Sequence, residues 1–234
     1  MYITAIVLAA GKGLRLKTKL SKPLIKVNSR PLIIYCLDTL SKHPAIGDII
    51  VVANRRNLKD ISRQIRRYRI GKIKDIVLGG RLRRVSVANG LRAIDKECSL
   101  VMVHDSARPF IDKKTISSLI KTAARYGAAI VGVPVKATIK SVKCQVSGVR
   151  CGFLVKKTLD RDNLWEVQTP QVFKKGLILK AYKKFGNTDV TDDASLVEKL
   201  GRQVRVVEGS YFNIKITTPE DLVLAEAILK SHKL

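Results

Sequence analysis

A glycine-containing segment near the N-terminus has the residue types of a phosphate-binding loop. Ala9-Ala10-Gly11-Lys12-Gly13 follows an apolar run, and Arg15 and Lys22 come soon after it. Backbone N–H groups in such a loop can approach a phosphate closely, and neighbouring cations favour a polyanion. Leu16 stands where a dinucleotide-binding motif has its third glycine, and the sequence has no P-loop motif. The segment therefore predicts a phosphate loop of another kind, with an ordinary tight turn as the alternative.

A carboxylate follows an apolar run in the middle of the sequence. Asp105 comes after Leu100–Val103 and His104, so we expect it at the carboxyl end of a strand, where α/β sheets bind ligands. One carboxylate is enough for Mg²⁺ at such a place, because phosphate oxygens and water complete the coordination. We predict that Asp105 binds Mg²⁺, with a simple turn cap as the alternative. His104 alternates to the other side of the strand and is predicted to be a core residue rather than a base.

The surrounding sequence predicts the elements that position these residues. Short β-branched runs alternate with segments of helical periodicity, which indicates right-handed crossovers and a parallel sheet covered on both faces. The predicted buried strands are Ile3–Leu8, Asp48–Ala53, Ile73–Leu78, Leu100–Val103 and Ala129–Val133, and the predicted helices have apolar stripes over Leu32–Leu40, Leu58–Tyr68 and Ile116–Ala123, with Gly127 as a C-cap. This order predicts an α/β fold, with a Rossmann-like, doubly wound and mostly parallel sheet, in a single domain over residues 1–234.

The pattern changes after Pro134. Alternating segments at Ala137–Lys143 and Phe153–Leu159 predict a protruding β-arm at about residues 136–160. Because two short strands are marginally stable alone, the arm is expected to pair with another chain in a homodimer. Beyond the arm, the sequence predicts helices at Lys174–Lys184 and Asp192–Leu200, strands at Val204–Val207 and Ile214–Thr217, and a last helix that begins with Thr218 and Pro219.

The composition excludes several classes of protein. The 234 residues include 45 Lys and Arg against 19 Asp and Glu, a net charge of +26, and 46% are hydrophobic. This balance suits a folded domain that meets polyanions, either phosphorylated small molecules or nucleic acid. The apolar runs are too short to span a membrane, the N-terminus lacks a signal-peptide pattern, and the four cysteines lack metal-ligand spacing. We expect a cytoplasmic protein with reduced thiols.

The glycine loop and several later strings together resemble one family. Leu8–Gly11, with Arg15 and Lys22, is similar to the signature of nucleotidyltransferases that join a nucleoside triphosphate to a sugar phosphate. His104–Phe110 resembles the acidic turn after the central strand in the same superfamily, and more narrowly in its cytidylyltransferases. Five further strings are similar to the 2-C-methyl-D-erythritol 4-phosphate cytidylyltransferase family: Thr158–Arg161, Leu164–Gln171, Val190–Asp193, Glu208–Ser210 and Asn213–Thr217. The resemblance covers essentially the whole chain. It implies an enzyme of non-mevalonate isoprenoid synthesis that condenses CTP with methylerythritol phosphate, releases pyrophosphate and uses a divalent cation such as Mg²⁺.

The resemblance also implies roles for particular residues. Arg15 and Lys22 would stabilise the pentavalent phosphorus, and Arg161 and Lys215 would hold the acceptor phosphate. The nucleotide and its metal would be bound by Ala9, Ala10, Gly11, Lys12, Gly13, Gly79, Gly80, Ser86 and Asp105. The acceptor would be bound by Asp105, Arg108, Thr138, Arg161, Thr169, Thr191 and Lys215, of which Thr138 and Arg161 would come from the arm of the partner subunit.

Two other functions stay open on the sequence. Relatives that use ribitol 5-phosphate share the strings Gln168–Gln171 and Phe212–Thr217, although Leu159–Arg161 with Leu164–Trp165 favours methylerythritol phosphate. Residues 81–85 lack the acidic side chains common in the cytosine loop of the family, so the resemblance supports the reaction class more than the base. The net charge of +26 would suit a nucleic-acid-binding protein, but no recognised binding module or interleaved aromatic set accompanies it.

Overall fold

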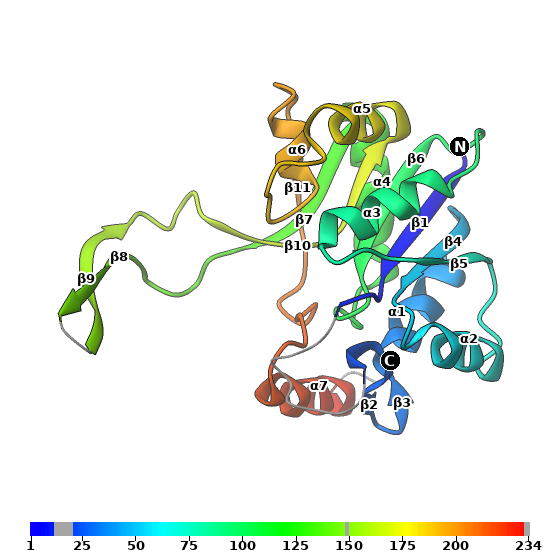
Figure 1. Cartoon of the computed structure of the whole chain (residues 1–234), viewed down its shortest axis with the longest axis horizontal. Coiled ribbons are helices and arrows are strands. Elements are labelled where there is room, and N and C mark those ends of the chain that lie inside the picture. The colour runs from blue at the N-terminus through cyan, green and yellow to red at the C-terminus, as the bar shows by residue number, and fades with distance from the viewer. Residues whose placement is uncertain (12–20, 148–149, 232–234) are drawn as a thin grey trace.

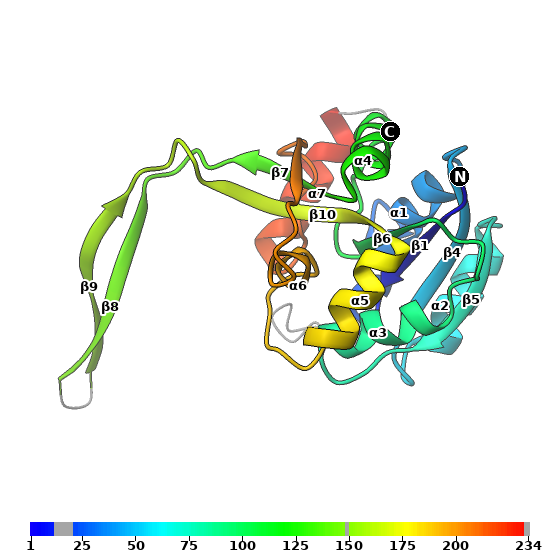
Figure 2. The ribbon, with the colours of Figure 1, turned by 90° about the horizontal axis from the view of Figure 1, so that it is seen from above.

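The computed structural model describes residues 1–11, 21–147 and 150–231. They form one seven-stranded sheet with helices on both faces, and a long two-stranded arm that leaves this body (Figures 1 and 2). The sheet contains β1 (Ile3–Leu8), β4 (Ile46–Ala53), β5 (Ile73–Leu78), β6 (Leu100–Asp105), β7 (Ala128–Pro134), β10 (Trp165–Lys174) and β11 (Arg205–Glu208). Their spatial order is β11-β7-β10-β6-β1-β4-β5, which confirms the predicted doubly wound α/β architecture.

The register of the parallel strands brings the two predicted chemical segments together. β1 pairs in parallel with β4 and β6, and Leu8 is aligned with both Val52 and Asp105. The loop that follows Leu8 therefore begins beside Asp105, at the carboxyl edge of the sheet. β5 lies at the edge, and its residues are only half-buried or exposed, so the prediction of a fully buried strand was wrong there.

One strand of the sheet was not predicted. β10 runs antiparallel between β6 and β7, with Val172 aligned with Met102 on one side and Ala129 on the other. Residues 168–173 of β10 are buried, and their sequence does not alternate between polar and apolar residues. The periodicity of a half-exposed strand is therefore missing, which is why β10 was not predicted. β10 brings the Gln-Thr-Pro-Gln string into the sheet next to the strand that ends in Asp105.

Helices cover both faces of the sheet because side chains alternate along the strands. Ala5 and Val7 of β1 belong to the core under one set of helices, and Ile6 belongs to the core under the other. The first face is covered by α1 (Leu32–Ser41), α2 (Leu58–Arg67) and α4 (Lys113–Tyr126), and the second by α3 (Arg83–Arg92), α5 (Lys175–Phe185) and α6 (Ala194–Glu198). Gly127 has a φ of 99° at the end of α4, which confirms the predicted C-cap. Within the described part of the chain, none of the helices combines the length and the apolar character needed to cross a membrane.

The C-terminal segment packs beneath the carboxyl edge of the sheet. Helix α7 (Pro219–Ser231) contacts a hairpin of β2 (Lys26–Val27) and β3 (Arg30–Pro31), close to the short 3-10 helix η2 (Lys22–Leu24) (Figure 1). The predicted strand Ile214–Thr217 does not form. Its Ile216 is buried among residues of α7 and the hairpin, and its N–H donates to the carbonyl of Ala107 at 2.9 Å. Because this segment crosses the loop after β6 instead of lying beside a strand, it has no ladder to join.

The predicted β-arm forms within the expected range of residues, with strands longer than the two predicted segments. β8 (Ile139–Ser147) and β9 (Arg150–Leu159) pair only with each other among the described strands and extend far from the body (Figure 2). Phe153, Leu154 and Val155 are 57–70% exposed on β9. An exposed apolar surface on a two-stranded sheet suits an interface with another chain.

Candidate active site

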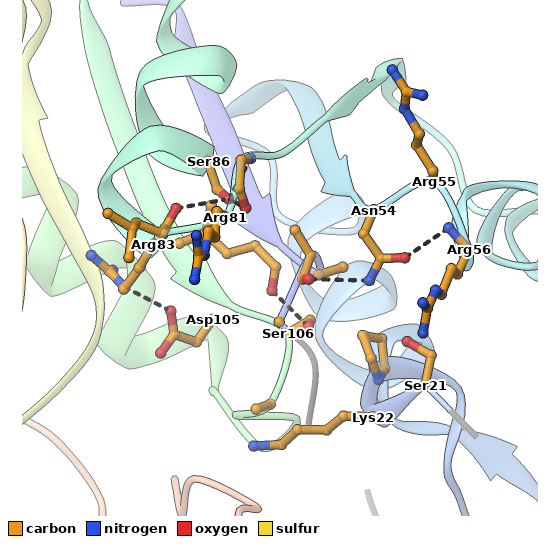
Figure 3. Close-up of a pocket in the computed structure, with 18 of the residues that line it drawn as sticks. Ser21, Lys22, Asn54, Arg55, Arg56, Arg81, Arg83, Ser86, Asp105 and Ser106 are labelled. Carbon is orange, nitrogen blue, oxygen red and sulfur yellow. Dashed lines mark hydrogen bonds and ion pairs between the residues drawn. The ribbon is translucent and has the colours of Figure 1, made fainter. Parts of the chain in front are cut away.

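A pocket of about 810 Å³ lies where the parallel strands end. We call it the first pocket (Figure 3). Its walls come from the ends of β1 and β6, from η2 and from the loops after β4 and β5. The lining residues used below are Ala9, Ala10, Gly11, Lys22, Asn54, Arg55, Arg56, Gly80, Arg83, Ser86, Asp105, Ser106 and Lys215. Segments far apart in the sequence thus meet at the edge where α/β sheets bind ligands.

The loops around the first pocket are tied together by two asparagines. The side-chain amide of Asn57 donates to the carbonyl of Ala9 at 2.9 Å, and that of Asn54 donates to the carbonyl of Ala10 at 3.1 Å. The same Asn57 amide donates to the Ser21 hydroxyl at 2.7 Å, just before η2. The loop after β4 therefore fixes both the start of the glycine loop and the helix that bears Lys22.

The loop after β5 needs glycine because its backbone is closely approached. A Cβ at position 79 would lie 2.6 Å from the Cβ of Ala10 and 2.7 Å from the Ser86 hydroxyl. A Cβ at position 80 would lie 2.2 Å from a methyl group of Val85. The Gly80 N–H donates to the Ser86 hydroxyl at 3.1 Å. The predicted group Gly79, Gly80 and Ser86 is thus brought beside the first loop, although Gly79 itself is not part of the pocket wall.

Asp105 lies between two cations at the carboxyl end of β6. Its Oδ2 is 2.6 Å from Lys215 Nζ, and its Oδ1 is 3.5 Å from Arg83 Nε. Burial alone would raise the pKa of the Asp105 carboxyl, but Arg83 and Lys215 more than offset this effect and hold the pKa well below its usual range. The carboxylate is therefore ionised at neutral pH and is paired with both cations.

A second, smaller pocket of about 320 Å³ shares a wall with the first. Arg83, Asp105 and Lys215 line both pockets. The second pocket is also lined by three predicted acceptor residues, namely Arg108, Thr169 and Thr191. Two ligands bound in the two pockets would therefore meet at one carboxylate and two cations.

Arg108 and Thr169 are partly engaged by neighbouring groups in the second pocket. Arg108 donates from Nη1 to the carbonyl of Asn213 at 2.7 Å, and the Thr169 hydroxyl accepts from the Asp105 N–H at 3.0 Å. His104 is fully buried, with its ring nitrogens 3.0 Å from the Arg108 carbonyl and 3.2 Å from the Thr169 hydroxyl. Burial lowers the pKa of His104 to about 4. These contacts confirm His104 as a core residue that supports the wall of the site.

Two of the predicted site residues that the structure describes lie away from both pockets. Within the described chain, Thr138 and Arg161 line neither pocket and lie exposed at the base of the arm, where Arg161 donates to the carbonyl of Lys136 at 2.6 Å. Their predicted role in a partner subunit stays a prediction. Lys12, Gly13 and Arg15 lie outside the described residues.

The sequence did not indicate several pocket residues. Arg83, Asn54, Arg55, Arg56 and Ser106 all line the first pocket without having been assigned a role. Asn54 stands directly after a predicted strand, which is a signal that could have been used. Arg83 is one of several arginines in its segment, and its partners are distant in sequence, so no local pattern distinguishes it.

The residues present fit a magnesium ion that is held largely by phosphates. The described residues contain no cluster of three or more acidic, histidine or cysteine side chains that could hold a metal alone. Asp105 offers carboxylate oxygens, the donors that Mg²⁺ prefers, on the wall of a pocket with the features of a phosphate site. One such carboxylate is sufficient when the substrate supplies the other oxygens.

The fold and the site define a class of protein. A small-residue loop, one carboxylate and several cations at the carboxyl ends of a doubly wound sheet are the features of a nucleotidyltransferase. A family model described as 2-C-methyl-D-erythritol 4-phosphate cytidylyltransferase matches residues 3–231. The chain belongs to this family and is therefore a cytidylyltransferase of the non-mevalonate isoprenoid pathway.

Individual relatives agree with the family. The chain is 43% identical over 231 residues to the 2-C-methyl-D-erythritol 4-phosphate cytidylyltransferase of Halalkalibacterium halodurans, over 98% of this chain and 97% of the relative. It is 44% identical over 235 residues to the protein of the same name from Geobacillus thermodenitrificans, over 99% of each. The structure of 4-diphosphocytidyl-2C-methyl-D-erythritol synthase from Anaerococcus prevotii is similar with a TM-score of 0.83 and 35% identity, over 98% of this chain and 96% of that one. These comparisons do not favour the ribitol 5-phosphate or nucleic-acid alternatives.

Proposed function

We propose that the chain joins CTP to 2-C-methyl-D-erythritol 4-phosphate, with the nucleotide in the first pocket and the acceptor in the second. The observation that supports this arrangement is the wall of Arg83, Asp105 and Lys215 that the two pockets share. A phosphate oxygen of the acceptor attacks the α-phosphorus of CTP and forms a phosphoanhydride bond. The bond from the α-phosphorus to the bridging oxygen breaks, and pyrophosphate leaves. The attacking phosphate is already anionic, so the reaction needs no general base.

The cations of the site counter the repulsion between the two polyanions. Lys215 holds the acceptor phosphate at the shared wall, and Lys22 on η2 lines the first pocket and acts on the α-phosphate. We propose the same role for Arg15 on the sequence pattern alone. Such pre-oriented charges act most strongly on the charge that builds up on the phosphorus in the transition state. Mg²⁺ bound through Asp105 would neutralise charge on the nucleotide phosphates. The backbone of Ala9, Ala10 and Gly11 lines the first pocket and would bind the triphosphate in this arrangement.

Base and acceptor are recognised at opposite ends of the site. Gly80 and Ser86 line the first pocket and contact the cytosine, and Gly79 allows the close packing of this loop against Ala10. Arg108, Thr169 and Thr191 contact the polyol of the acceptor from the second pocket.

The arm completes the acceptor site of a second subunit in this proposal. Arg161 and Thr138 are exposed at the base of the arm, and β9 exposes apolar side chains that a partner would cover. Arg161 suits a phosphate monoester because its planar fork makes two parallel charge-assisted hydrogen bonds. We therefore propose a homodimer, working in the cytoplasm.

The test is pyrophosphate release from CTP with Mg²⁺ and one polyol phosphate at a time. We expect release with 2-C-methyl-D-erythritol 4-phosphate and little with ribitol 5-phosphate. Replacing CTP by UTP or ATP tests the base, because residues 81–85 differ from the usual cytosine loop of the family. Equal or faster turnover with ribitol 5-phosphate would overturn the acceptor, and no release with either would overturn the proposed function.

A further inference from the structure

Arg83 connects the shared wall with a group outside both pockets. Its Nε is 3.5 Å from Asp105 Oδ1, and its Nη1 is 2.8 Å from Asp193 Oδ2. Figure 3 shows the guanidinium turned toward Asp105 at the side of the first pocket. Asp193 lines neither pocket among the described residues. One planar side chain therefore joins a carboxylate of the site to a carboxylate behind it.

Asp193 is a rigid anchor for this arginine. Its side chain is only 1% exposed, and its Oδ1 accepts a hydrogen bond from the hydroxyl of Tyr182 on α5. Its backbone N–H donates to Gln171 Oε1 at 3.2 Å, which ties it to β10. Burial opposes the charge of Arg83, but Asp193 and Asp105 more than offset it and raise the pKa of the guanidinium. Arg83 is thus charged, and its guanidinium is paired with Asp193 on the side away from Asp105.

The contact also links the two sides of the proposed site. Arg83 is the first residue of α3 and follows the Gly79–Gly80 loop. Asp193 immediately precedes α6 and follows Thr191 of the second pocket. The two ion pairs of Arg83 therefore connect the start of α3, the start of α6 and the carboxylate that lines both pockets.

We propose that Arg83 is a positioning residue that, anchored by Asp193, holds Asp105 and through it Lys215 in the orientation required between nucleotide and acceptor. The inference rests on the proposed function. A residue that orients a ligand-binding side chain can affect the rate strongly without touching the ligand itself. The reason is that small displacements of reacting groups lower the rate by large factors.

The experiment compares kinetics and stability in Arg83→Gln, Asp193→Asn and the double variant. Arg83→Gln is expected to lower kcat about 10- to 100-fold, while the KM for CTP changes by no more than about threefold. Because it leaves Asp193 buried without its cation, it should also lower the thermal midpoint by about 5 °C or more. Steady-state pyrophosphate release and thermal unfolding measure the two effects separately.

The double variant distinguishes positioning from a purely structural role. Asp193→Asn in the Arg83→Gln background replaces the buried carboxyl group that has lost its cation, so the thermal midpoint should return toward that of the wild type. Its kcat should stay within about twofold of Arg83→Gln, because Asp105 still lacks its partner. If kcat recovers together with the midpoint, Arg83 only stabilises the fold and the inference is wrong.

Arg84→Gln is the matched control. Arg84 is the next residue of α3 and pairs with the fully exposed Asp189 at 3.7 Å, and neither pocket includes it in the described chain. This variant should keep wild-type kcat. Wild-type enzyme without pyrophosphate release would overturn the proposed function, whereas active wild type with Arg83→Gln as fast as Arg84→Gln would overturn this inference alone.

Discussion

Replacing Lys215 by glutamine should reveal how much of the rate comes from the cation at the shared wall. Lys215 Nζ is 2.6 Å from Asp105 Oδ2, and its side chain is 41% exposed. In the proposed complex, the ammonium group of Lys215 lies beside a charged phosphate oxygen of the acceptor. Two such unit charges about 4 Å apart interact by about 4 kcal/mol at an effective dielectric constant of about 20. Solvent reaches Lys215 and screens part of this interaction energy. Another part already stabilises the bound substrates before the reaction and therefore does not lower the barrier. We therefore expect kcat to fall by about 10²-fold, at the low end of losses measured for such groups.

The assay is steady-state pyrophosphate release with each substrate varied in turn. Because Lys215 is proposed to contact the acceptor, the KM for CTP should change by no more than about threefold. Lys42→Gln is a matched control, since Lys42 pairs with Asp38 at 2.9 Å on an exposed helix end. A Lys215→Gln enzyme with kcat within about threefold of the Lys42→Gln enzyme would refute the reasoning.

Three further predictions follow from the site, the arm and the core. Lys22→Ala and Arg15→Ala should each lower kcat by about 10² or more with modest change in the acceptor KM, and near-normal kcat would remove that residue from the mechanism. Arg161→Ala should raise the acceptor KM, and mixing it with Lys22→Ala should partly restore activity, because one site of the heterodimer then has both native residues; inactivity after verified subunit exchange would show that Arg161 does not act across the dimer. His104, whose pKa falls from 6.5 to about 4 on folding, contributes stability that is fully present above pH 6.5 and is lost as the pH falls toward 4. The loss should be about 3 kcal/mol at most. Urea titrations at pH 7 and pH 4.5 should show a smaller loss for His104→Gln than for the wild type, and equal losses would contradict this assignment.

The sequence by itself determined the elements that repeat a local pattern. The strands that precede Gly11 and Asp105, the helices α1, α2 and α4, and the arm follow from hydrophobic periodicity and from turn residues, which act over a few neighbours. Helix α3 was not predicted, because its few buried residues do not form a clear apolar stripe. The parallel register then follows from the order of strands and helices, so the meeting of the glycine loop with Asp105 was predictable. The boundaries of β1 and β5 agree with the prediction at both ends.

Only the tertiary structure decided which charged side chains contact one another. Arg83, Asp105, Asp193 and Lys215 come from four separate segments, and no local spacing records that one arginine lies between two of these carboxylates. The segment at Ile214–Thr217 has the β-branched residues of a strand, but packing against α7 and the loop after β6 outweighs that local preference. Local propensities amount to a few tenths of a kcal/mol per residue, whereas burying a side chain such as Ile216 contributes about 2 kcal/mol. Packing between distant segments therefore decides where the charged groups of these segments lie, and local sequence patterns do not.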